Sequence, residues 1–362
     1  MFGLRKWRKR IGRIINGFYD YILGGGCIVE PHVESIIERT QKYLENIPTM
    51  IIGSGFSVPF GLPTMDNLAS QLKNELSSKY EGDEGWNDFT DLLDKDYDLE
   101  SALLDVSLNE DITKEIIEVT WSMVNLLDRK AFLEFIREAQ NKGLSNIFNT
   151  LLQSHPRKVD VITTNYDRLI EYSADKVNAE IQMGFKGEYM KRLDKIDTQP
   201  KPNQKSIVLC KVHGSLDWFK KEKGNQIISL PNSENILNDF QPVIVTPGIH
   251  KYQETHNEPF RTMINAADTL ISEATSFLCI GYGFNDDHLH PKLINQIESL
   301  EKEIVIVTKT LTEGGKKIIK NAKKFVVFEE DSQGGTKITS HDGIINSKEE
   351  FWKIDEFANM WL

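Results

Sequence analysis

The sequence predicts an α/β protein with a doubly wound parallel sheet. Short apolar runs rich in Val and Ile have the length of strands and alternate with stretches of helical periodicity. The runs are residues 49–52, 159–163, 207–212, 243–245, 277–280, 304–307 and 325–328. Runs of this kind are typical of strands that helices cover on both faces, as in a parallel sheet. With 362 residues, the chain can form one large domain or two modest ones.

The first 30 residues are basic and amphipathic. Six positive charges precede the first acidic residue, Asp20, and apolar side chains are interleaved behind them. The charges are Arg5, Lys6, Arg8, Lys9, Arg10 and Arg13. We expect an amphipathic helix that ends at the glycines 24–26. It can pack on its own domain, or it can dock to an acidic partner surface or to a membrane face.

The catalytic unit is expected over residues 31–330. A helix is predicted at 31–46 and a strand at 49–52, and Thr64 can cap a helix that carries Leu68, Leu72 and Leu76. Residues 69–157 read as a helical insertion, helical throughout from 99 to 152, with an acidic stretch at 81–100. A further strand is expected at 226–230, and helices near 259–275, 286–300 and 311–323. Residues 331–362 are predicted to form a polar tail with a docking helix.

Composition limits the classes of function. The formal net charge of −11 gives no reason to expect direct nucleic-acid binding by the whole surface. Cys27, Cys210 and Cys279 are scattered, which argues against a disulfide framework and for a reducing, cytoplasmic compartment. No apolar run approaches the ~20 residues of a membrane span.

Four polar or glycine-rich segments each follow one of the apolar runs. They are Gly53-Ser54-Gly55-Phe56-Ser57 with Gly61-Leu62-Pro63, then residues 163–167 (Thr-Thr-Asn-Tyr-Asp), then His213-Gly214, then Gly281-Tyr282-Gly283. The carboxyl ends of parallel strands meet at one edge of a sheet, where ligands bind. Glycines at such an edge let backbone N–H groups approach a diphosphate. The segments therefore predict one pocket for a nicotinamide cofactor.

The order and residue types of these segments resemble the Sir2 (sirtuin-like) family over roughly residues 48–328. The resemblance implies a Rossmann-like, sirtuin-type fold that binds NAD. The first segment matches the Gly-x-Gly-x-Ser loop and Gly-(Ile/Leu)-Pro turn of that family. Thr64-Met65 stands where sirtuin deacylases have a Phe-Arg pair, which argues against deacylation.

The resemblance also assigns roles. Asn165 matches the asparagine that positions the ribose and a water, Asp167 the carboxylate beside it, and His213 the catalytic histidine, which suits general-base work near neutral pH. The alternatives from the residues alone are a polar turn with Asn and Asp caps, and a hydrogen-bonded turn histidine. The expected cofactor-binding residues are Gly53, Ser54, Gly55, Phe56, Ser57, Pro63, Thr164, Gly281, Tyr282, Gly283, Asn285 and Thr308.

No metal site is expected. Sirtuin deacylases carry two Cys-x-x-Cys pairs after the His-Gly strand, but residues 215–241 contain no cysteine. His288 and His290 are two residues apart and would not share a helix face.

Zinc-free chains with this pattern resemble bacterial NAD hydrolases of anti-phage defence. The resemblance implies cleavage of NAD⁺ to nicotinamide and ADP-ribose, which depletes NAD and arrests the infected cell. Control would come from self-assembly as a homo-oligomer or from a partner such as a HerA-type ring ATPase. The alternatives are an NAD-dependent protein deacylase or ADP-ribosyltransferase, and a non-catalytic module that binds NAD or ADP-ribose.

Overall fold

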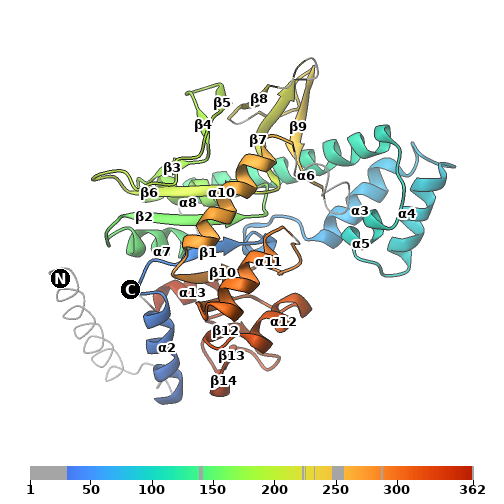
Figure 1. The fold of residues 1–362 in the computed structure, drawn as a ribbon. Helices are drawn as coiled ribbons and strands as arrows, with labels where there is room; N and C mark the ends of the chain where they lie inside the picture. The colour runs from blue at the N-terminus through green and yellow to red at the C-terminus, as the bar shows by residue number, and fades with distance from the viewer. Residues whose placement is uncertain are drawn as a thin grey trace.

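A computed structural model describes residues 31–137, 142–221, 224, 226–231, 233–246, 257–286 and 288–360 (Figure 1). The expected N-terminal helix, Cys27 and the last two residues lie outside the described part. None of the described helices is both long and apolar enough to span a bilayer.

The fold is built on a nine-stranded sheet with the order β14-β13-β12-β11-β10-β1-β2-β6-β3. Its strands are β1 (Thr49–Ile52), β2 (Lys158–Thr163), β3 (Glu180–Gln182), β6 (Ser206–Lys211), β10 (Ser276–Ile280), β11 (Glu303–Val307), β12 (Phe325–Glu330), β13 (Thr336–Ser340) and β14 (Gly343–Ser347). All neighbours from β12 to β3 pair in parallel. The predicted α/β fold class is confirmed.

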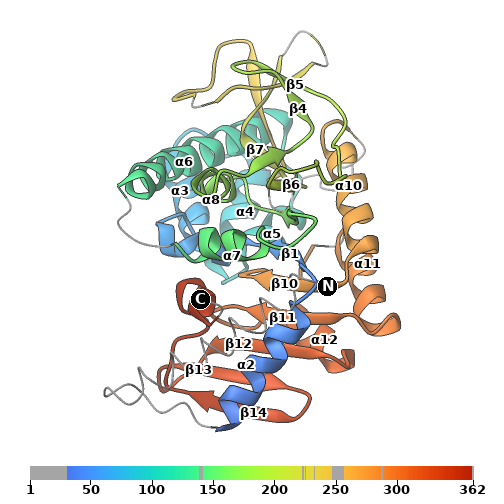
Figure 2. The same cartoon turned by 90° about the vertical axis from the view of Figure 1, so that its left-hand side faces the viewer.

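Helices cover both faces of this sheet, because successive side chains of its strands enter different cores (Figure 2). Met50 and Ile52 face a core shared with α2, α6, α7, α8 and α13, whereas Ile51 faces one shared with α10, α11 and α12. The helices outside the insertion are α2 (Pro31–Tyr43), α8 (Leu169–Lys176), α10 (Phe260–Glu273), α11 (His290–Ile294), α12 (Glu313–Asn321) and α13 (Ile354–Asn359), and a π-helical turn, Asn295–Ser299, follows α11.

The expected helical insertion lies between β1 and β2. Two short 3₁₀ turns, Ser54–Phe56 and Val58–Phe60, come first. They are followed by α3 (Met65–Leu76), α4 (Glu84–Asp94), α5 (Leu99–Leu104), α6 (Glu110–Ile136) and α7 (Gly143–Leu151). Thr64 caps α3 through a capping box with Asn67, as its position predicted. Helices α3, α4 and α5 stand to one side of the sheet and, with the start of α6, enclose a small core of their own (Figure 1).

A second sheet corrects one sequence prediction. Residues 243–245 were expected in the parallel sheet, but β9 (Phe240–Ile244) pairs antiparallel with β7 (Gly214–Lys221). This sheet has the order β4-β5-β8-β7-β9, with β4 (Phe185–Lys186), β5 (Lys191–Leu193) and β8 (Ile227–Ser229). The chain reverses directly after β6 because Gly214 has a φ of 89°, which a side chain would disfavour. Apolar side chains around Trp218 then give the sheet its own core.

The C-terminal region also differs from the sequence prediction. Where a polar tail was expected, β13 and β14 extend the main sheet as an antiparallel hairpin. In β13 the apolar Ile338 alternates with polar residues, and β14 is the edge strand of the sheet, so both strands are compatible with the polar composition of this region. The expected docking helix corresponds to α13, which packs against α7.

Candidate active site

The four sequence segments come together at the carboxyl edge of four neighbouring strands. β10, β1, β2 and β6 are adjacent and parallel, and they end at Ile280, Ile52, Thr163 and Lys211. The chain runs from β1 outward to β2 and β6 and then returns to β10 on the other side of β1. Such a reversal of strand order is where open α/β sheets bind ligands.

The two glycine loops interlock through their backbones. A Cβ on Gly53 would lie 2.6 Å from the carbonyl oxygen of Gly281, and one on Gly55 would lie 2.9 Å from Gly281 Cα. Gly281 has a φ of 54°, and a Cβ there would lie 2.2 Å from the nitrogen of Phe56. Each of these three positions therefore needs glycine for close approach.

Four of the five backbone amide groups of the loop at residues 53–57 are used within the protein. Gly53 N donates to Ile280 O at 3.0 Å and Gly55 N to Gly281 O at 3.0 Å, while Phe56 and Ser57 donate back into their own loop. Such amides were expected to bind a diphosphate. In this structure they tie the loop to β10, and Ser54 and Gly55 are the parts of the loop that solvent reaches.

Asn165 is fixed by its amide. Its Nδ2 donates to Gly53 O and to Ser57 Oγ, both at 3.0 Å, and its backbone N–H donates to Thr163 Oγ1. Both hydrogens of Nδ2 are thereby used, so the oxygen Oδ1 is the part of the amide that can bind a further donor. Asn165 as a whole residue is 6% exposed.

Asp167 completes this chain of hydrogen bonds. Ser57 Oγ donates to Asp167 Oδ2 at 2.6 Å, and Leu169 N donates to Oδ1 at 3.2 Å. Burial raises the pKa of the carboxyl above its ordinary value of 3.8, although Lys211 and the Ser57 hydroxyl act in the opposite direction. Asn165, Ser57 and Asp167 therefore form one buried polar group.

Lys211 and Arg168 make further contacts that fix the chain segment carrying Asn165 and Asp167. Lys211 is completely buried, and its Nζ binds the carbonyl oxygens of Tyr166 and Asp167 and, at 2.8 Å, Glu171 Oε1. Arg168 binds Asp128 of α6 through its backbone N–H, Nε and Nη2. The segment is thus attached both to β6 and to the insertion.

His213 reaches the site from β6. It is 8% exposed, and its Nε2 lies 2.6 Å from Oδ2 of Asp286, in the loop after β10. The two atoms are at ion-pair distance but do not meet the angle of a hydrogen bond. The other carboxylate oxygen, Oδ1, accepts the backbone N–H groups of His288 and Leu289. The pair joins the outer two of the four site strands.

The remaining predicted cofactor residues are at the same edge but differ in exposure. Phe56 and Tyr282 are buried in ring contacts with Phe60 and Phe284, and Asn285 is exposed. The carbonyl of Gly283 accepts a hydrogen bond from Thr312. Thr164 and Thr308 are half-buried, and the Thr308 hydroxyl binds the carbonyl of Thr310. The cofactor role of these residues stays a prediction.

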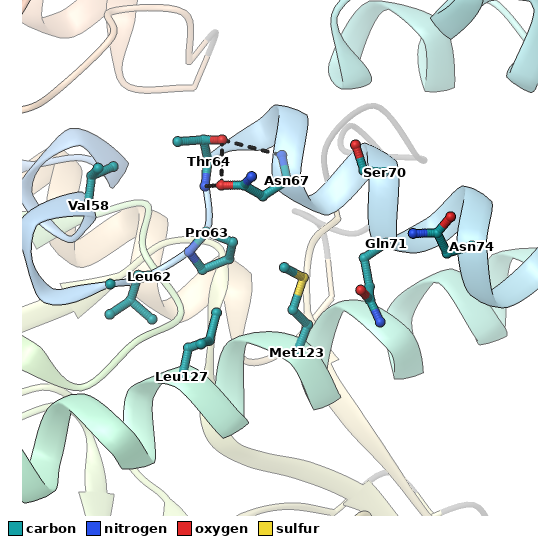
Figure 3. Close-up of a pocket in the computed structure, with 11 residues that line it drawn as sticks. Val58, Leu62, Pro63, Thr64, Asn67, Ser70, Gln71, Asn74, Met123 and Leu127 are labelled. Atoms are coloured by element: carbon teal, nitrogen blue, oxygen red, sulfur yellow. Dashed lines mark hydrogen bonds between the residues drawn. The ribbon is translucent and has the colours of Figure 1, made fainter.

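Pro63 lines a pocket of about 500 Å³ between the first loop, α3 and α6 (Figure 3). Its floor is apolar, with Leu62, Met123 and Leu127, and Asn67 and Gln71 of α3 face it. Asn165, Asp167 and His213 are not among its lining residues. The pocket therefore borders the predicted cofactor loop without containing the polar group built on Asn165.

Metal ligands and reactive thiols are not gathered at this edge in the described part of the chain. No three His, Cys, Asp or Glu side chains there lie close enough together to hold an ion. Cys210 and Cys279 are buried in β6 and β10, and burial raises the pKa of both thiols, which disfavours the reactive thiolate.

Sequence reasoning missed three groups that shape the site: Lys211, Asp286 and the Asp128–Arg168 pair. A lysine within the apolar run 207–212 was a usable signal, because a lysine in a buried strand needs a partner. Asp286 follows the Gly281-Tyr282-Gly283 turn and could have been weighed with Asn285. The Asp128 partnership depends on how α6 packs, which no local pattern reveals.

Comparisons with known proteins found one matching family model and several similar solved structures. Residues 159–323 match the family model of the SIR2-like domain. This match covers β2, β6 and β10 and includes Asn165, His213 and Gly281. The resemblance to SIR2-like domains is therefore confirmed over that stretch. No curated protein matches the chain.

Two solved structures illustrate the similarity. A Sir2 homologue in complex with NAD is 14% identical with a TM-score of 0.48, and the match covers 91% of this chain and 93% of the homologue. Sir2Tm bound to a propionylated peptide is 13% identical with a TM-score of 0.40, and the match covers 80% of this chain and 91% of Sir2Tm.

Proposed function

We propose that this chain is an NAD⁺ glycohydrolase that cleaves NAD⁺ to nicotinamide and ADP-ribose. The observation that carries the proposal is the meeting of Asn165, Asp167 and His213 at the edge of neighbouring parallel strands, within the SIR2-like stretch. NAD⁺ is the substrate in this proposal, and no metal is required.

The residues present fit the ribose end of NAD⁺. The bound Nδ2 of Asn165 leaves Oδ1 to accept a hydrogen bond from a water or a ribose hydroxyl. The imidazole of His213 retains some exposure, and a neutral imidazole has one nitrogen that can accept a proton. Asp167 supplies a carboxylate within the same polar group, which favours positive charge on the sugar.

The reaction breaks the bond between the ribose C1′ and the nicotinamide nitrogen, and both electrons leave with nicotinamide. The oxygen of a water then adds to C1′, and the water's proton passes to His213. This transition state resembles an oxocarbenium ion, so positioned dipoles and charge supply most of the catalysis.

Hydrolysis is favoured over acyl transfer by two features of the chain. Thr64-Met65 follows the Gly-Leu-Pro turn, and α3 begins there with a threonine cap. Residues 214–244 contain no cysteine pair, and the strands described within this range, β7, β8 and β9, belong to the small antiparallel sheet. Without the zinc module that helps to form the peptide cleft of a deacylase, water is the default acceptor.

The biological role belongs to the same proposal. An NAD-depleting enzyme must be held inactive until it is needed, which suits an effector of abortive infection in anti-phage defence. We propose that it acts in the cytoplasm and that assembly into a homo-oligomer, or a HerA-type ring ATPase partner, controls it. The basic segment at residues 1–23 is the candidate for that contact, because its six charges precede every pocket motif.

The decisive experiment is incubation of the purified full chain with NAD⁺, alone and with the product of its genomic neighbour, followed by analysis of the products. We expect equimolar nicotinamide and ADP-ribose, formed at a rate that excess chelator does not change and that falls ~10²–10⁴-fold in His213→Ala. Products that need an acyl-lysine peptide or another acceptor would support the deacylase or transferase alternative. Binding of NAD⁺ without loss of NAD⁺ under all conditions would support the non-catalytic module.

A further inference from the structure

We infer that Asp286 is a positioning residue that holds the proton of His213 on Nε2 and so leaves Nδ1 as the ring's proton acceptor. This inference deepens the proposed function and rests on it for its catalytic meaning. The tautomer itself is a property of the unliganded protein, and it can be tested whether or not NAD⁺ is cleaved.

The contact itself requires a proton between the two groups. Nε2 of His213 and Oδ2 of Asp286 are 2.6 Å apart, and both atoms are buried. Two lone pairs at that separation would repel strongly in a site with little water, so one of the atoms must carry hydrogen. The observed bend of the contact is common in unliganded sites, where catalytic hydrogen bonds straighten only when substrate is bound.

The proton belongs to the histidine and not to the carboxyl group. Oδ1 of Asp286 accepts the backbone N–H groups of His288 at 3.0 Å and Leu289 at 3.3 Å. Donation from two amides stabilises the ionised carboxylate. These hydrogen bonds also fix which oxygen faces the ring, since a rotated carboxylate would lose them.

The consequence for His213 follows from the chemistry of imidazole. A neutral ring has one N–H donor and one acceptor nitrogen, and the partner of one nitrogen decides the state of the other. A carboxylate at Nε2 selects Nε2–H, so Nδ1 is the nitrogen that can take a proton from water. The same arrangement of carboxylate and histidine orients the base of serine proteases, with the two ring nitrogens exchanged.

The Asp286→Asn variant provides a selective test, because its geometry is constrained. The amide oxygen must take the place of Oδ1 to keep the N–H groups of His288 and Leu289 bonded. The NH₂ group then faces Nε2, which becomes an acceptor, and the ring proton moves to Nδ1. Asp286→Ala removes the contact without imposing either tautomer, but it also removes the acceptor for the two amides.

The inference therefore predicts opposite orders for activity and stability. Turnover should fall in the order wild type, Asp286→Ala, Asp286→Asn, with a loss of ~10²–10⁴-fold in kcat for Asp286→Asn and little change in KM. Melting temperature should fall in the order wild type, Asp286→Asn, Asp286→Ala. Asp83→Asn is the matched control, since Asp83 caps α4 through Trp86 N and is remote from the site in sequence and fold, and its turnover should be unchanged.

The direct readout is the ¹⁵N spectrum of the full chain labelled at its eight histidines, with His213 assigned by loss of its signals in His213→Gln. We expect Nε2–H in the wild type and Nδ1–H in Asp286→Asn. Nδ1–H in the wild type would overturn the inference even if NAD⁺ is cleaved. The inference would also be overturned if Asp286→Asn had the same turnover as Asp286→Ala, or if Asp286→Ala had a higher turnover than the wild type. Absence of NAD⁺ cleavage together with Nε2–H would refute the proposed function and leave the tautomer assignment standing.

Discussion

Asn165 and His213 follow neighbouring strands and lie at one edge of the sheet, yet the protein holds them in different ways. Asn165 belongs to a continuous polar group in which Ser57, Asp167 and the Gly53 carbonyl each have defined partners. The side chain of His213 meets Asp286 in a single bent contact. The asparagine half of the site is therefore held by more hydrogen bonds than the histidine half.

The largest expected effect is on turnover. Asn165→Ala and His213→Ala should each lower the rate of NAD⁺ hydrolysis by ~10²–10⁴-fold, the usual cost of removing a positioned acid–base group. The double variant should be little worse than either single one, because groups that act as a unit are not additive. Product assays with variants shown by circular dichroism to be folded would check this.

Stability should separate the two variants. Asn165→Ala removes a side chain that donates two buried hydrogen bonds, so it should lower the melting temperature more than His213→Ala does. Equal melting temperatures, or losses of activity that multiply fully in the double variant, would contradict the contrast between the two halves.

The next effect concerns the attachment of the asparagine half to the insertion. Asp128→Ala should lower the free energy of unfolding by about 3–5 kcal/mol, because it leaves the buried guanidinium of Arg168 without its carboxylate. Glu134→Ala on the same helix breaks an exposed pair with Arg137 and should cost less than about 0.5 kcal/mol. Urea denaturation measures the free energy of unfolding of both variants. Similar losses would show that the buried Asp128–Arg168 pair stabilises the protein no more than the exposed Glu134–Arg137 pair does.

Ser57→Ala should have a smaller effect on stability, of about 1–3 kcal/mol, because it leaves Nδ2 of Asn165 and Oδ2 of Asp167 without a shared partner. Ser70→Ala, which removes an exposed hydroxyl on α3, is the control. If Ser57→Ala is as stable as Ser70→Ala, the polar group does not act as one unit.

The smallest effect depends on pH. The pKa of Asp167 is raised in the fold, so its favourable contribution is complete below its unfolded value of 3.8 and is lost as the pH rises through the folded pKa. Asp167→Asn should therefore gain stability relative to the wild type as the pH rises through that window, by about 1.4 kcal/mol for each unit of the shift. Unfolding curves from pH 3 to 7 test the sign, and a difference that shrinks with rising pH would show that the pKa is lowered.

Sequence patterns were sufficient for the elements whose signal is local. The apolar runs located the parallel strands, and Thr64 located the start of α3. The pairing of β9 with β7 could not be predicted, because Val243 and Ile244 are equally suited to either sheet and only the reversal at Gly214 decides between them. The hairpin of β13 and β14 could not be predicted, because its many polar residues do not form an apolar run.

In the site, too, the features with a local sequence signal could be predicted and those that depend on distant contacts could not. The positions of Asn165, His213 and the glycines at one edge follow from strand order, which the sequence indicated. The contacts of Lys211, Asp128 and Asp286 join residues that are far apart in the chain, and they depend on packing. The local signals of these contacts were the charged residue inside the apolar run 207–212 and the position of Asp286 directly after the Gly281-Tyr282-Gly283 turn.

The interlocked glycines have a consequence for the order in which the protein matures. Gly53 and Gly55 are among the first residues of the catalytic unit to be synthesised, but the backbone against which they close, at Gly281, emerges after both Asn165 and His213. Contacts between such distant segments form late, since a long loop of chain must first be ordered. A ribosome-bound or truncated chain that ends before β10 would carry Asn165 and His213 without an assembled site, so under the proposed function a newly made chain could not cleave NAD⁺ until most of it had been translated.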